Sequence, residues 1–300
     1  MTINNSKKTA EKIVEVFTDF TLPVIKKEGK TNNDFMKDLV KVSNIVRRIL
    51  LTSSQICSTQ IPAYKAEILA GHMVRIFKLY DTYILMIVEK RGELAFIISR
   101  CLTETIINFE YLLKYLNTEV FKKYKRASLS LDRKFKKFMV DYYRERGLGP
   151  KPLQDKMVKS LNKTFKRSGL RLEENELKKT EWGLKKEHLK ISGKAKDVGL
   201  YEIYELIFKR TSAHVHGSWH DLDFNHLSPK KDKSGMRYPN VKFMEPMPHM
   251  LFAPSIMALN ATIKYWDMIG FNDFNPRIQK VIEWFQNMAE QHKDYLIKTA

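Results

Sequence analysis

Residues 63–90, AYKAEILAGHMVRIFKLYDTYILMIVEK, and residues 93–116, ELAFIISRCLTETIINFEYLLKYL, carry the longest apolar runs of the chain. In both, apolar residues recur at spacings of three and four, which places them on one face of an α-helix. Lys78, Asp81 and Arg100 are among the charged residues that interrupt these runs before either reaches membrane-spanning length. The two stretches therefore predict long helices that pack in a protein core, and no membrane-spanning helix is expected.

The same helical periodicity continues through most of the chain, and the alternating runs typical of strands are very few. The sequence therefore predicts an all-α protein, a multi-helix bundle. Further helices are predicted over residues 9–21, 33–53, 118–125, 131–146, 153–167, 198–216, 250–270 and 276–298. With 43% apolar residues in a chain of 300, one substantial hydrophobic core can form.

We expect a single helical domain over residues 1–300, with core elements at about 33–117 and 198–299. Residues 122–197 are expected to form a basic helical insertion or lobe, because Gly-Leu-Gly-Pro at 147–150 breaks the helical pattern. Residues 227–248 contain four prolines and Gly235 and predict a long irregular loop. Long ordered loops of this kind often serve as functional lids.

Positive charge is concentrated in the predicted insertion. The chain has a net charge of +19, and residues 122–196 contain 24 Lys and Arg against 9 Asp and Glu. Such a concentration attracts polyanions, so nucleic acid is the expected partner. The alternative is that these lysines only form solvated helix faces. The cations expected to contact nucleic acid are Lys134, Lys137, Lys163, Lys166 and Arg167, and the same block contains Phe135, Phe138 and Trp182.

Cys57 and Cys101 are the two cysteines of the chain, too few for a disulfide framework. The first residues, Met-Thr-Ile-Asn-Asn-Ser-Lys-Lys, have no apolar signal-peptide core. We therefore expect a cytoplasmic protein. No glycine loop of the Walker or dinucleotide-binding type occurs, so no nucleotide cofactor is expected.

Residues 204–226, YELIFKRTSAHVHGSWHDLDFNH, contain four of the eight histidines. On a helix, Arg210 and His214 lie nearly above one another, and Ser212 and His216 form a second pair at the same spacing. Gly217 is suited to end that helix. An arginine, expected here to be buried, and a histidine combine a permanent cation with a group that exchanges protons near neutral pH. This combination suits cleavage at a phosphate.

A second polar set lies in the stretch 93–116, where Arg100, Glu104 and Asn108 follow one another at intervals of four and share a helix face. The apolar surroundings indicate at least partial burial, and a buried charge needs a partner. One interpretation is an intrahelical ion pair between Arg100 and Glu104 that fixes helix packing. The other is that these residues support the histidine cluster.

The segment Arg210 to His216 resembles the arginine, four to six residues, histidine signature of the HEPN ribonuclease superfamily. The chain also resembles an uncharacterised bacterial family of helical proteins of that kind, many from defence-associated loci, over residues 60–220. Arg100 with Glu104, and Ser212 with His216 and Gly217, occupy the places of that family's motifs.

The resemblance implies a HEPN-like core and metal-independent RNA cleavage by a toxin or antiviral defence effector. His216 or His214 would be the general base on the ribose 2′-hydroxyl, and Arg210 would bind the scissile phosphate. Glu104, Arg100, Ser212 and Asn108 would support the site. The resemblance also implies a homodimer, and an antitoxin or another protein of a defence complex is a possible partner.

Two alternatives remain open at this histidine cluster. The first is a metal site, since His214, His216, His220, Asp221, Asp223 and His226 together exceed the three or four ligands that Zn²⁺ or Mn²⁺ needs; its central candidates are His216, His220 and His226. The second is a non-catalytic binding or scaffold protein, in which Arg210 pairs with Glu104 or Glu205 and the histidines only complete a helix end.

Two tryptophans receive different interpretations. Trp266 lies among plainly apolar residues and is predicted to pack in the core. Trp219 lies between His216 and His220, where it could stack on a nucleic-acid base or cover the site.

Overall fold

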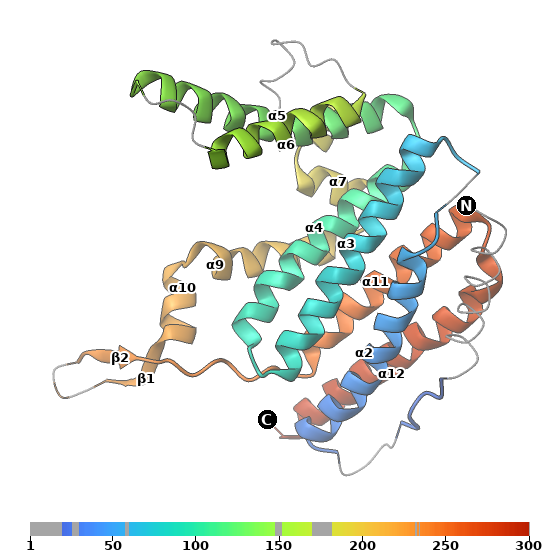
Figure 1. Ribbon diagram of the computed structural model, residues 1–300. Coiled ribbons are helices and arrows are strands. Elements are labelled where there is room, and N and C mark those ends of the chain that lie inside the picture. Colours follow the sequence, from blue (N-terminus) through green and yellow to red (C-terminus); the bar gives the residue numbers. More distant parts are fainter. Residues whose placement is uncertain are drawn as a thin grey trace. The chain divides into compact units, whose positions relative to one another are not determined.

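The computed structural model describes residues 20–25, 30–57, 60–147, 152–169, 182–231, 233 and 235–299. These residues form an all-α protein, which confirms the predicted fold class, and they contain one short pair of strands (Figure 1). The chain divides into two compact units, which are described one at a time. Unit 1 comprises Met1–Leu113 and Val198–Ala300, and unit 2 comprises Lys114–Asp197.

The core of unit 1 is a bundle of long helices (Figure 1). They are α2 (Asn32–Ser54), α3 (Ala63–Val88), α4 (Gly92–Lys114), α11 (His249–Ile269) and α12 (Asn275–Thr299). Each was predicted from apolar periodicity, and each predicted end lies within two residues of the observed one. The helix predicted over residues 9–21 lies outside the described residues but for its last two positions.

Large aromatic side chains fill this core, and their polar atoms have partners. Trp266 is fully buried, as predicted, and its Nε1 donates to Ser53 Oγ at 2.9 Å. The hydroxyl of Tyr265 donates to the Ile56 carbonyl at 2.6 Å, and Tyr80 shares a hydrogen bond of 2.7 Å with Ser255. Because a buried polar atom without a partner is costly, these bonds fix the register of α2, α3 and α11.

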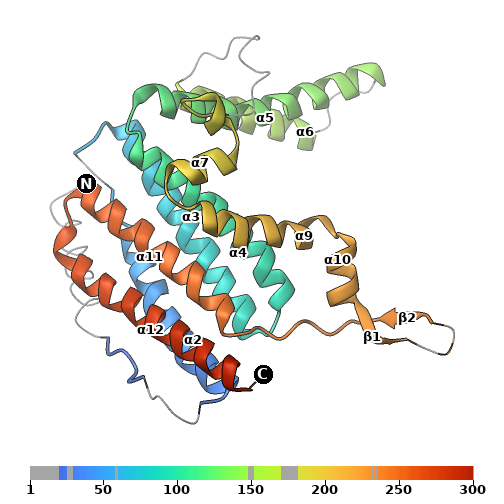
Figure 2. The same cartoon turned by 180° about the vertical axis from the view of Figure 1, so that it is seen from behind.

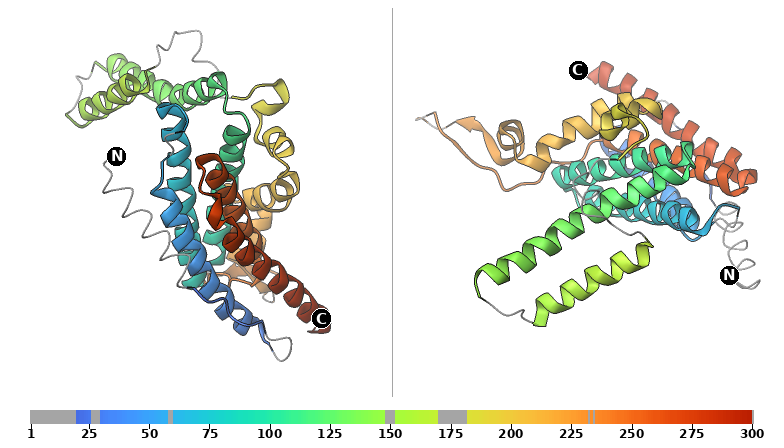
Figure 3. Two further views of the ribbon diagram at one scale, coloured as in Figure 1. Left: turned by 90° about the vertical axis from the view of Figure 1, so that its right-hand side faces the viewer. Right: turned by 90° about the horizontal axis from the view of Figure 1, so that it is seen from above.

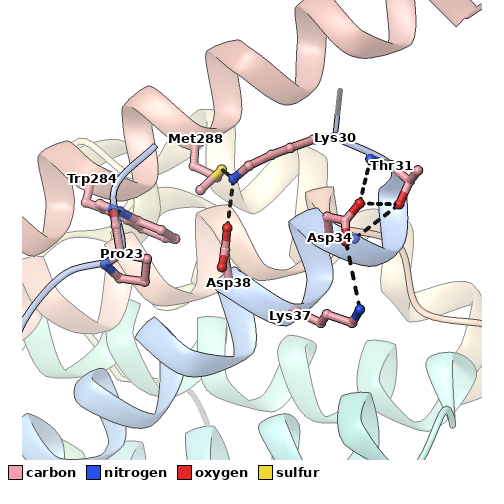
Figure 4. A network of polar contacts seen from close by, with 8 residues as sticks. All are labelled: Pro23, Lys30, Thr31, Asp34, Lys37, Asp38, Trp284 and Met288. Carbon is pink, nitrogen blue, oxygen red and sulfur yellow. Dashed lines mark hydrogen bonds and ion pairs between the residues drawn. The ribbon is translucent and has the colours of Figure 1, made fainter. Parts of the chain in front are cut away.

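The segment that leads into α2 is held against α12 by a polar network (Figure 4). Trp284 of α12 donates from Nε1 to the Pro23 carbonyl at 2.9 Å. Lys30 forms an ion pair of 2.7 Å with Asp38 of α2. Thr31 and Asp34 bond reciprocally in a capping box, which satisfies two free N–H groups at the start of the helix.

Residues 198–248 depart from the sequence prediction. In place of one helix over 198–216, the chain forms α8 (Tyr201–Ile203), the π-helical segment η3 (Tyr204–Lys209) and α9 (Arg210–His216). Next come α10 (Trp219–Asp221), a second π-helical segment η4 (Leu222–His226), and strands β1 (Leu227–Lys231) and β2 (Arg237–Pro239).

The prediction of an irregular loop over 227–248 is therefore wrong in its first part, where β1 and β2 pair antiparallel. Arg237 holds this hairpin to η4, since its guanidinium bonds the carboxylate and the carbonyl of Asp223. Figure 2 shows α10 and the hairpin extending away from the bundle, and the chain then returning to α11. At that return the Gly92 N–H donates to the Met244 carbonyl at 2.9 Å, and a Cβ at Gly92 would lie 2.7 Å from that oxygen.

Unit 2 contains a long helical hairpin, α5 (Thr118–Glu145) and α6 (Pro152–Ser168), whose helices run side by side (Figure 3). The helices predicted separately over 118–125 and 131–146 are one continuous helix. Beside the hairpin lie a 3₁₀ turn, η2 (Lys186–Leu189), and α7 (Ile191–Asp197). Trp182 is buried here, with the Lys194 ammonium 3.6 Å from its ring centroid, so this tryptophan belongs to the core of unit 2.

Among the described residues, no helix is both long enough and apolar enough to cross a membrane.

The buried tryptophan and an exposed one give a direct test of the core. We expect Trp266→Ala to lower the free energy of unfolding by about 3–5 kcal/mol, because it removes a fully buried ring and leaves Ser53 without its donor. Trp219, with 70% of its surface exposed, is the matched control, and Trp219→Ala should change stability by less than about 0.5 kcal/mol. Urea unfolding of both variants measures this, and equal effects would contradict the assignment.

Candidate functional site

The polar residues of 204–226 meet one face of α4. Phe96 of α4 stacks on the His214 ring of α9, with ring centroids 4.7 Å apart and ring planes 16° apart. One turn further along α4, Arg100 donates from Nε to Ser212 Oγ at 3.0 Å, and its guanidinium lies 4.4 Å from the Phe208 ring centroid. As the residue numbers rise along α4, those of the contacted residues fall along α9 and η3, so these two segments lie antiparallel to α4.

Local chain geometry explains how His214 reaches its position. The π-helical segment η3 precedes α9, and π-helical turns of this kind are frequent at functional sites. Gly217 ends α9 in the left-handed conformation, with φ 55° and ψ 46°, as predicted. Ser218 then caps α10 by accepting a hydrogen bond from the Asp221 N–H, and α10 brings the Asp221 side chain back to α9.

His214 is held by a buried carboxylate. Its Nδ1 lies 2.6 Å from Asp221 Oδ1, and only 12% of the His214 side chain and 6% of the Asp221 side chain are exposed. Asn225 donates from Nδ2 to the same carboxylate oxygen at 2.8 Å. On the other side of the carboxylate, His226 Nε2 lies 3.4 Å from Asp221 Oδ2. Asp221 therefore joins a mostly buried histidine to one whose side chain is half exposed.

The charge of Asp221 depends on these partners. Burial acts to raise the pKa of its carboxyl, but the hydrogen bonds from Asn225 and His214, together with the charges of His214 and His226, outweigh burial and hold the pKa below its ordinary value of 3.8. Asp221 is thus an anion near neutral pH. An anion at Nδ1 keeps the proton of a neutral imidazole on that nitrogen.

The other ring nitrogen of His214, Nε2, forms no hydrogen bond to any described residue. Some polar atoms of the described residues are fully buried and have no partner, but Nε2 is not one of them. Nε2 is therefore not fully buried. An imidazole fixed in this tautomer presents an unprotonated nitrogen that can accept a proton from a bound molecule.

Arg210 and His216 occupy different surroundings from His214. Arg210 is exposed, so the expectation that it is buried is wrong, and His216 is exposed too. Neither forms an ion pair or a hydrogen bond within the described part of the chain. Glu205, one of the partners considered for Arg210, instead pairs with Lys209 at 2.9 Å. On α9, Arg210 shares its side of the helix with His214, whereas His216 lies about a third of a turn from Arg210 and nearly half a turn from His214.

The three polar residues of α4, Arg100, Glu104 and Asn108, do not all make the same contact. Arg100 contacts α9, but the predicted Arg100–Glu104 ion pair does not form, since Arg100 bonds Ser212 instead. Glu104 is partly buried and pairs with no other described residue. Asn108 is also partly buried. The structure thus joins Arg100, Ser212 and His214 through one helix contact, and Glu104 lies one turn away from it on α4.

The metal alternative finds no support in the geometry. In the ranges that the structure describes, no group of three or more His, Cys, Asp or Glu residues is arranged so that it could hold a metal ion. Instead, His220 stacks on Phe224, with ring centroids 6.1 Å apart, and His226 lies beside Asp221.

Two exposed aromatic rings lie close in sequence to Asp221, which together with His214 is called the dyad below. Trp219 is 70% exposed and Phe224 is 66% exposed, and both lie within three residues of Asp221. In unit 2, all five cations predicted to contact nucleic acid are exposed: Lys134, Lys137, Lys163, Lys166 and Arg167.

Three residues of the site were not identified as such from the sequence. Asp221 was considered only as a metal ligand, Phe96 only as part of the apolar surroundings of Arg100 and Glu104, and Asn225 not at all. The available signal was the pattern Ser218-x-x-Asp221-x-x-x-Asn225, because a serine cap three residues before an acid starts a helix and a spacing of four places Asn225 above Asp221. No local pattern could have paired Phe96 with His214.

A family of unknown function, DUF5677, matches residues 66–234, a range that includes the whole of this site. No curated protein and no solved structure matches the chain.

Replacing Asp221 tests the dyad through stability. Because the pKa of Asp221 is lowered in the folded protein, its ionised form stabilises the fold above the ordinary value of 3.8, and this contribution is lost as the pH falls through the folded-state pKa. We expect Asp221→Asn to cost about 1–3 kcal/mol at pH 7 and distinctly less at pH 3. Urea unfolding at both pH values measures the two differences. Asp294→Asn, at an exposed carboxylate of α12, should show little effect at either, and a cost for Asp221→Asn that grows towards pH 3 would contradict the assignment.

Proposed function

Since the chain belongs to the DUF5677 family, a family of unknown function, we propose its activity from the site itself: it is a metal-independent endoribonuclease. The observation that carries the proposal is the His214–Asp221 dyad, in which a buried anion bonds one nitrogen of an imidazole whose other nitrogen has no partner among the described residues. The resemblance to HEPN ribonucleases supports the same reaction class.

In the proposed reaction, His214 Nε2 accepts the proton of a ribose 2′-hydroxyl. The 2′-oxygen then forms a bond to the adjacent phosphorus, and the bond from phosphorus to the 5′-oxygen of the next nucleotide breaks. A water molecule gives a proton to that leaving oxygen, and His214 returns its own proton to the hydroxide that remains, which restores the base. The products are a 2′,3′-cyclic phosphate and a 5′-hydroxyl, and no metal or redox partner is needed to balance the step.

Arg210 is proposed to bind the scissile phosphate, because it is an exposed cation without a described partner on the same side of α9 as His214. Asp221 acts through His214 as a positioning residue, and Asn225 and Phe96 help to fix the ring. Arg100 and Ser212 hold α9 against α4. Glu104 and Asn108, on the same face of α4, are proposed to support this contact.

RNA is the proposed substrate, and its unpaired bases would stack on the exposed rings of Trp219 and Phe224. The exposed lysines of α5 and α6 would attract the phosphate backbone. We further propose a cytoplasmic toxin or antiviral defence effector with a HEPN-like core, which acts as a homodimer and is controlled by an antitoxin or another protein of a defence complex.

A non-catalytic binding protein is the second candidate. The observation in its favour is that the exposed cations of unit 2 and the exposed rings of unit 1 could bind nucleic acid without any reaction at His214. Substitution of His214 distinguishes the two candidates. In an enzyme it lowers the rate of RNA cleavage and leaves the affinity for RNA unchanged, whereas a binding protein has no cleavage to lose.

The first test measures cleavage of a fluorescent RNA oligonucleotide by purified protein in the presence of a metal chelator. We expect His214→Ala and Asp221→Asn to lower kcat by about 10²–10⁴-fold, because the general base is removed or loses its tautomer. Arg210→Ala should lower kcat by about 10²-fold or more. His220→Ala, at an exposed histidine, and Lys209→Ala, at an exposed cation next to Arg210, are the controls, and each should keep most of the activity.

Wild-type protein that binds the RNA but leaves it intact, with or without added divalent metal, would move the assignment to the binding protein. Loss of activity on chelation would contradict the metal-independent reaction. Mass spectrometry of the product ends provides a separate check, because the proposed step leaves a 2′,3′-cyclic phosphate.

A second test concerns the basic hairpin. Replacing Lys134, Lys137, Lys163 and Lys166 together by Glu should weaken binding of the same RNA and reduce the slope of log affinity against log salt, since fewer phosphates are neutralised. The cleavage rate at saturating RNA should change little. An unchanged salt slope would show that these lysines are only a solvated face.

A further inference from the structure

The outer part of the α5–α6 hairpin packs little of its apolar surface. From Leu131 to the end of α5, Met139 is the only buried residue, and α6 has none. Helices gain most of their stability from packing an apolar face against a neighbour. An apolar face that stays exposed on two neighbouring helices therefore indicates a contact that the described residues do not themselves make.

The exposed apolar residues of α5 form one stripe. Leu131 is 60% exposed, Phe135 44% and Phe138 62%. The partly buried Tyr142 continues the line, with its ring centroid 5.9 Å from that of Phe138. These positions follow the pattern i, i+4, i+7, i+11, which keeps all four side chains on one side of the helix.

Two hydrogen bonds show which side of each helix faces the other. Gln154 of α6 donates from Nε2 to the Tyr143 hydroxyl of α5 at 2.5 Å. Closer to the start of α5, Lys136 donates from Nζ to Asn162 of α6 at 2.6 Å. The residue numbers fall along α5 as they rise along α6, so the two helices run antiparallel.

Helix α6 carries a second apolar stripe, in which Leu153 is 66% exposed and Met157 is 37% exposed. Measured from the side of each helix that faces the other, the stripes of α5 and α6 both lie about 120° away in the same sense. For antiparallel helices that rotation leads to the same side of the hairpin. The two stripes therefore form one apolar face, made of Leu131, Phe135, Phe138, Leu153 and Met157.

Positive charge borders this apolar face. Residues 131–168 contain 12 Lys and Arg against 4 Asp and Glu. Lys134 of α5, and Lys156 and Arg167 of α6, lie about 60–80° around their helices from the stripes, at the two outer edges of the hairpin. All three are exposed, and they are called the edge cations below.

The opposite side of the hairpin carries further cations. Lys137 and Lys166 are exposed and lie about 130–160° around their helices from the stripes. Asp141 does not offset these charges, because it is already paired with Arg144 of the same helix at 2.8 Å. The hairpin therefore presents an uncharged face on a strongly basic element, which favours an occupant that is both apolar and anionic.

We infer that the apolar face binds the surface of an anionic lipid bilayer. The hairpin lies in the plane of the interface, with the rings of Phe135 and Phe138 below the level of the headgroup phosphates and the edge cations beside those phosphates. Long cationic side chains suit this position, because an apolar stem carries the charge out to the polar layer. The contact is peripheral and requires no membrane-spanning helix. It concerns unit 2 alone and does not depend on RNA cleavage.

RNA fits the opposite side of the hairpin better than the apolar face. A phosphate backbone gains its affinity from cations, and Lys137 and Lys166 lie on that opposite side. Bases stack on flat aromatic rings, but three of the five residues of the apolar face are aliphatic. RNA could therefore use the charge of the hairpin and still leave most of this face in water.

A partner protein would have to match a fixed pattern. It would need an apolar surface as wide as two helices, with one acid opposite Lys134 and others opposite Lys156 and Arg167 at the far edge. Lipids in a fluid bilayer move sideways, so anionic headgroups gather at both edges without any such pattern. The bilayer therefore satisfies the apolar face and the edge cations together.

Co-sedimentation with lipid vesicles tests the inference on the full chain. One set of vesicles contains phosphatidylcholine and phosphatidylglycerol in equal amounts, and the other contains phosphatidylcholine alone. The measurement is made at about 0.15 M salt, where long-range attraction is screened. We expect the wild type to bind the anionic vesicles at least about tenfold more tightly than the neutral ones.

A pair of variants tests the apolar face itself. Phe138→Ser should weaken binding to the anionic vesicles by at least about tenfold, because the ring no longer leaves water on binding. Val140→Ser is the matched control, since Val140 is 48% exposed on the same helix. It lies about 170° around α5 from the stripe, so its replacement should change the affinity by less than about twofold. Circular dichroism confirms that both variants keep their helices.

RNA binding separates the two anionic partners. The affinity of the same variants for a fluorescent RNA oligonucleotide is measured by anisotropy without vesicles. Phe138→Ser should change this affinity by less than about twofold, because it removes no cation.

Three results would overturn the proposal. A wild type that does not sediment with anionic vesicles assigns the apolar face to a partner protein. Vesicle binding that Phe138→Ser leaves unchanged shows only the general attraction of a basic chain to an anionic surface. A loss of RNA affinity in Phe138→Ser as large as its loss of vesicle affinity assigns the face to nucleic acid.

Discussion

The arrangement of the site depends on one buried anion. A carboxylate with 6% of its side chain exposed is costly unless it is bonded, and Asp221 meets that requirement with His214, Asn225 and His226. Removing it would leave His214 Nδ1 with only Asn225 Nδ2, at 3.3 Å, as a neighbour. The short α10 would also lose the side-chain bond that ties it to α9. The same interaction fixes the tautomer of the histidine, so the chemistry that we propose and the folding of residues 210–226 have a common cause.

The helix α4 determines where that anion can act. Its face carries Phe96 against His214 and Arg100 against Ser212, and the π-helical segment η3 directly precedes the α9 residues that make both contacts. In a uniform α-helix over 198–216 the side chains before and after η3 would be turned relative to one another by a different angle. Two exposed groups, Arg210 and His216, remain available to a ligand, while the mostly buried His214 is positioned by its neighbours.

The long helices could be predicted from the sequence, because each buries one continuous apolar face and periodicity reports that face directly. The glycine that ends α9 could be predicted too, since a left-handed residue favours glycine. The π-helical segments and the β1–β2 hairpin could not, because they depend on distant contacts such as Arg237 with Asp223. At the site, spacing placed Arg210 and His214 on one side of a helix, but burial and partners distinguish His214 from His216, and these come from Phe96 and Asp221. Trp182 shows the opposite error. It was grouped with the residues expected to contact nucleic acid because it lies in a basic segment, but its ring is buried in the core of unit 2.

The central claim is that Asp221 holds neutral His214 with its proton on Nδ1 and leaves Nε2 free to act as a base. Long-range ¹H–¹⁵N correlation spectra of the imidazole rings, assigned with His214→Ala, test this at a pH where the ring is neutral. The account predicts that His214 shows a protonated Nδ1 and an unprotonated Nε2, and that Asp221→Asn removes this preference. A neutral His214 that carries its proton on Nε2 in the wild type would contradict the account, because its exposed nitrogen could not then accept a proton from a substrate.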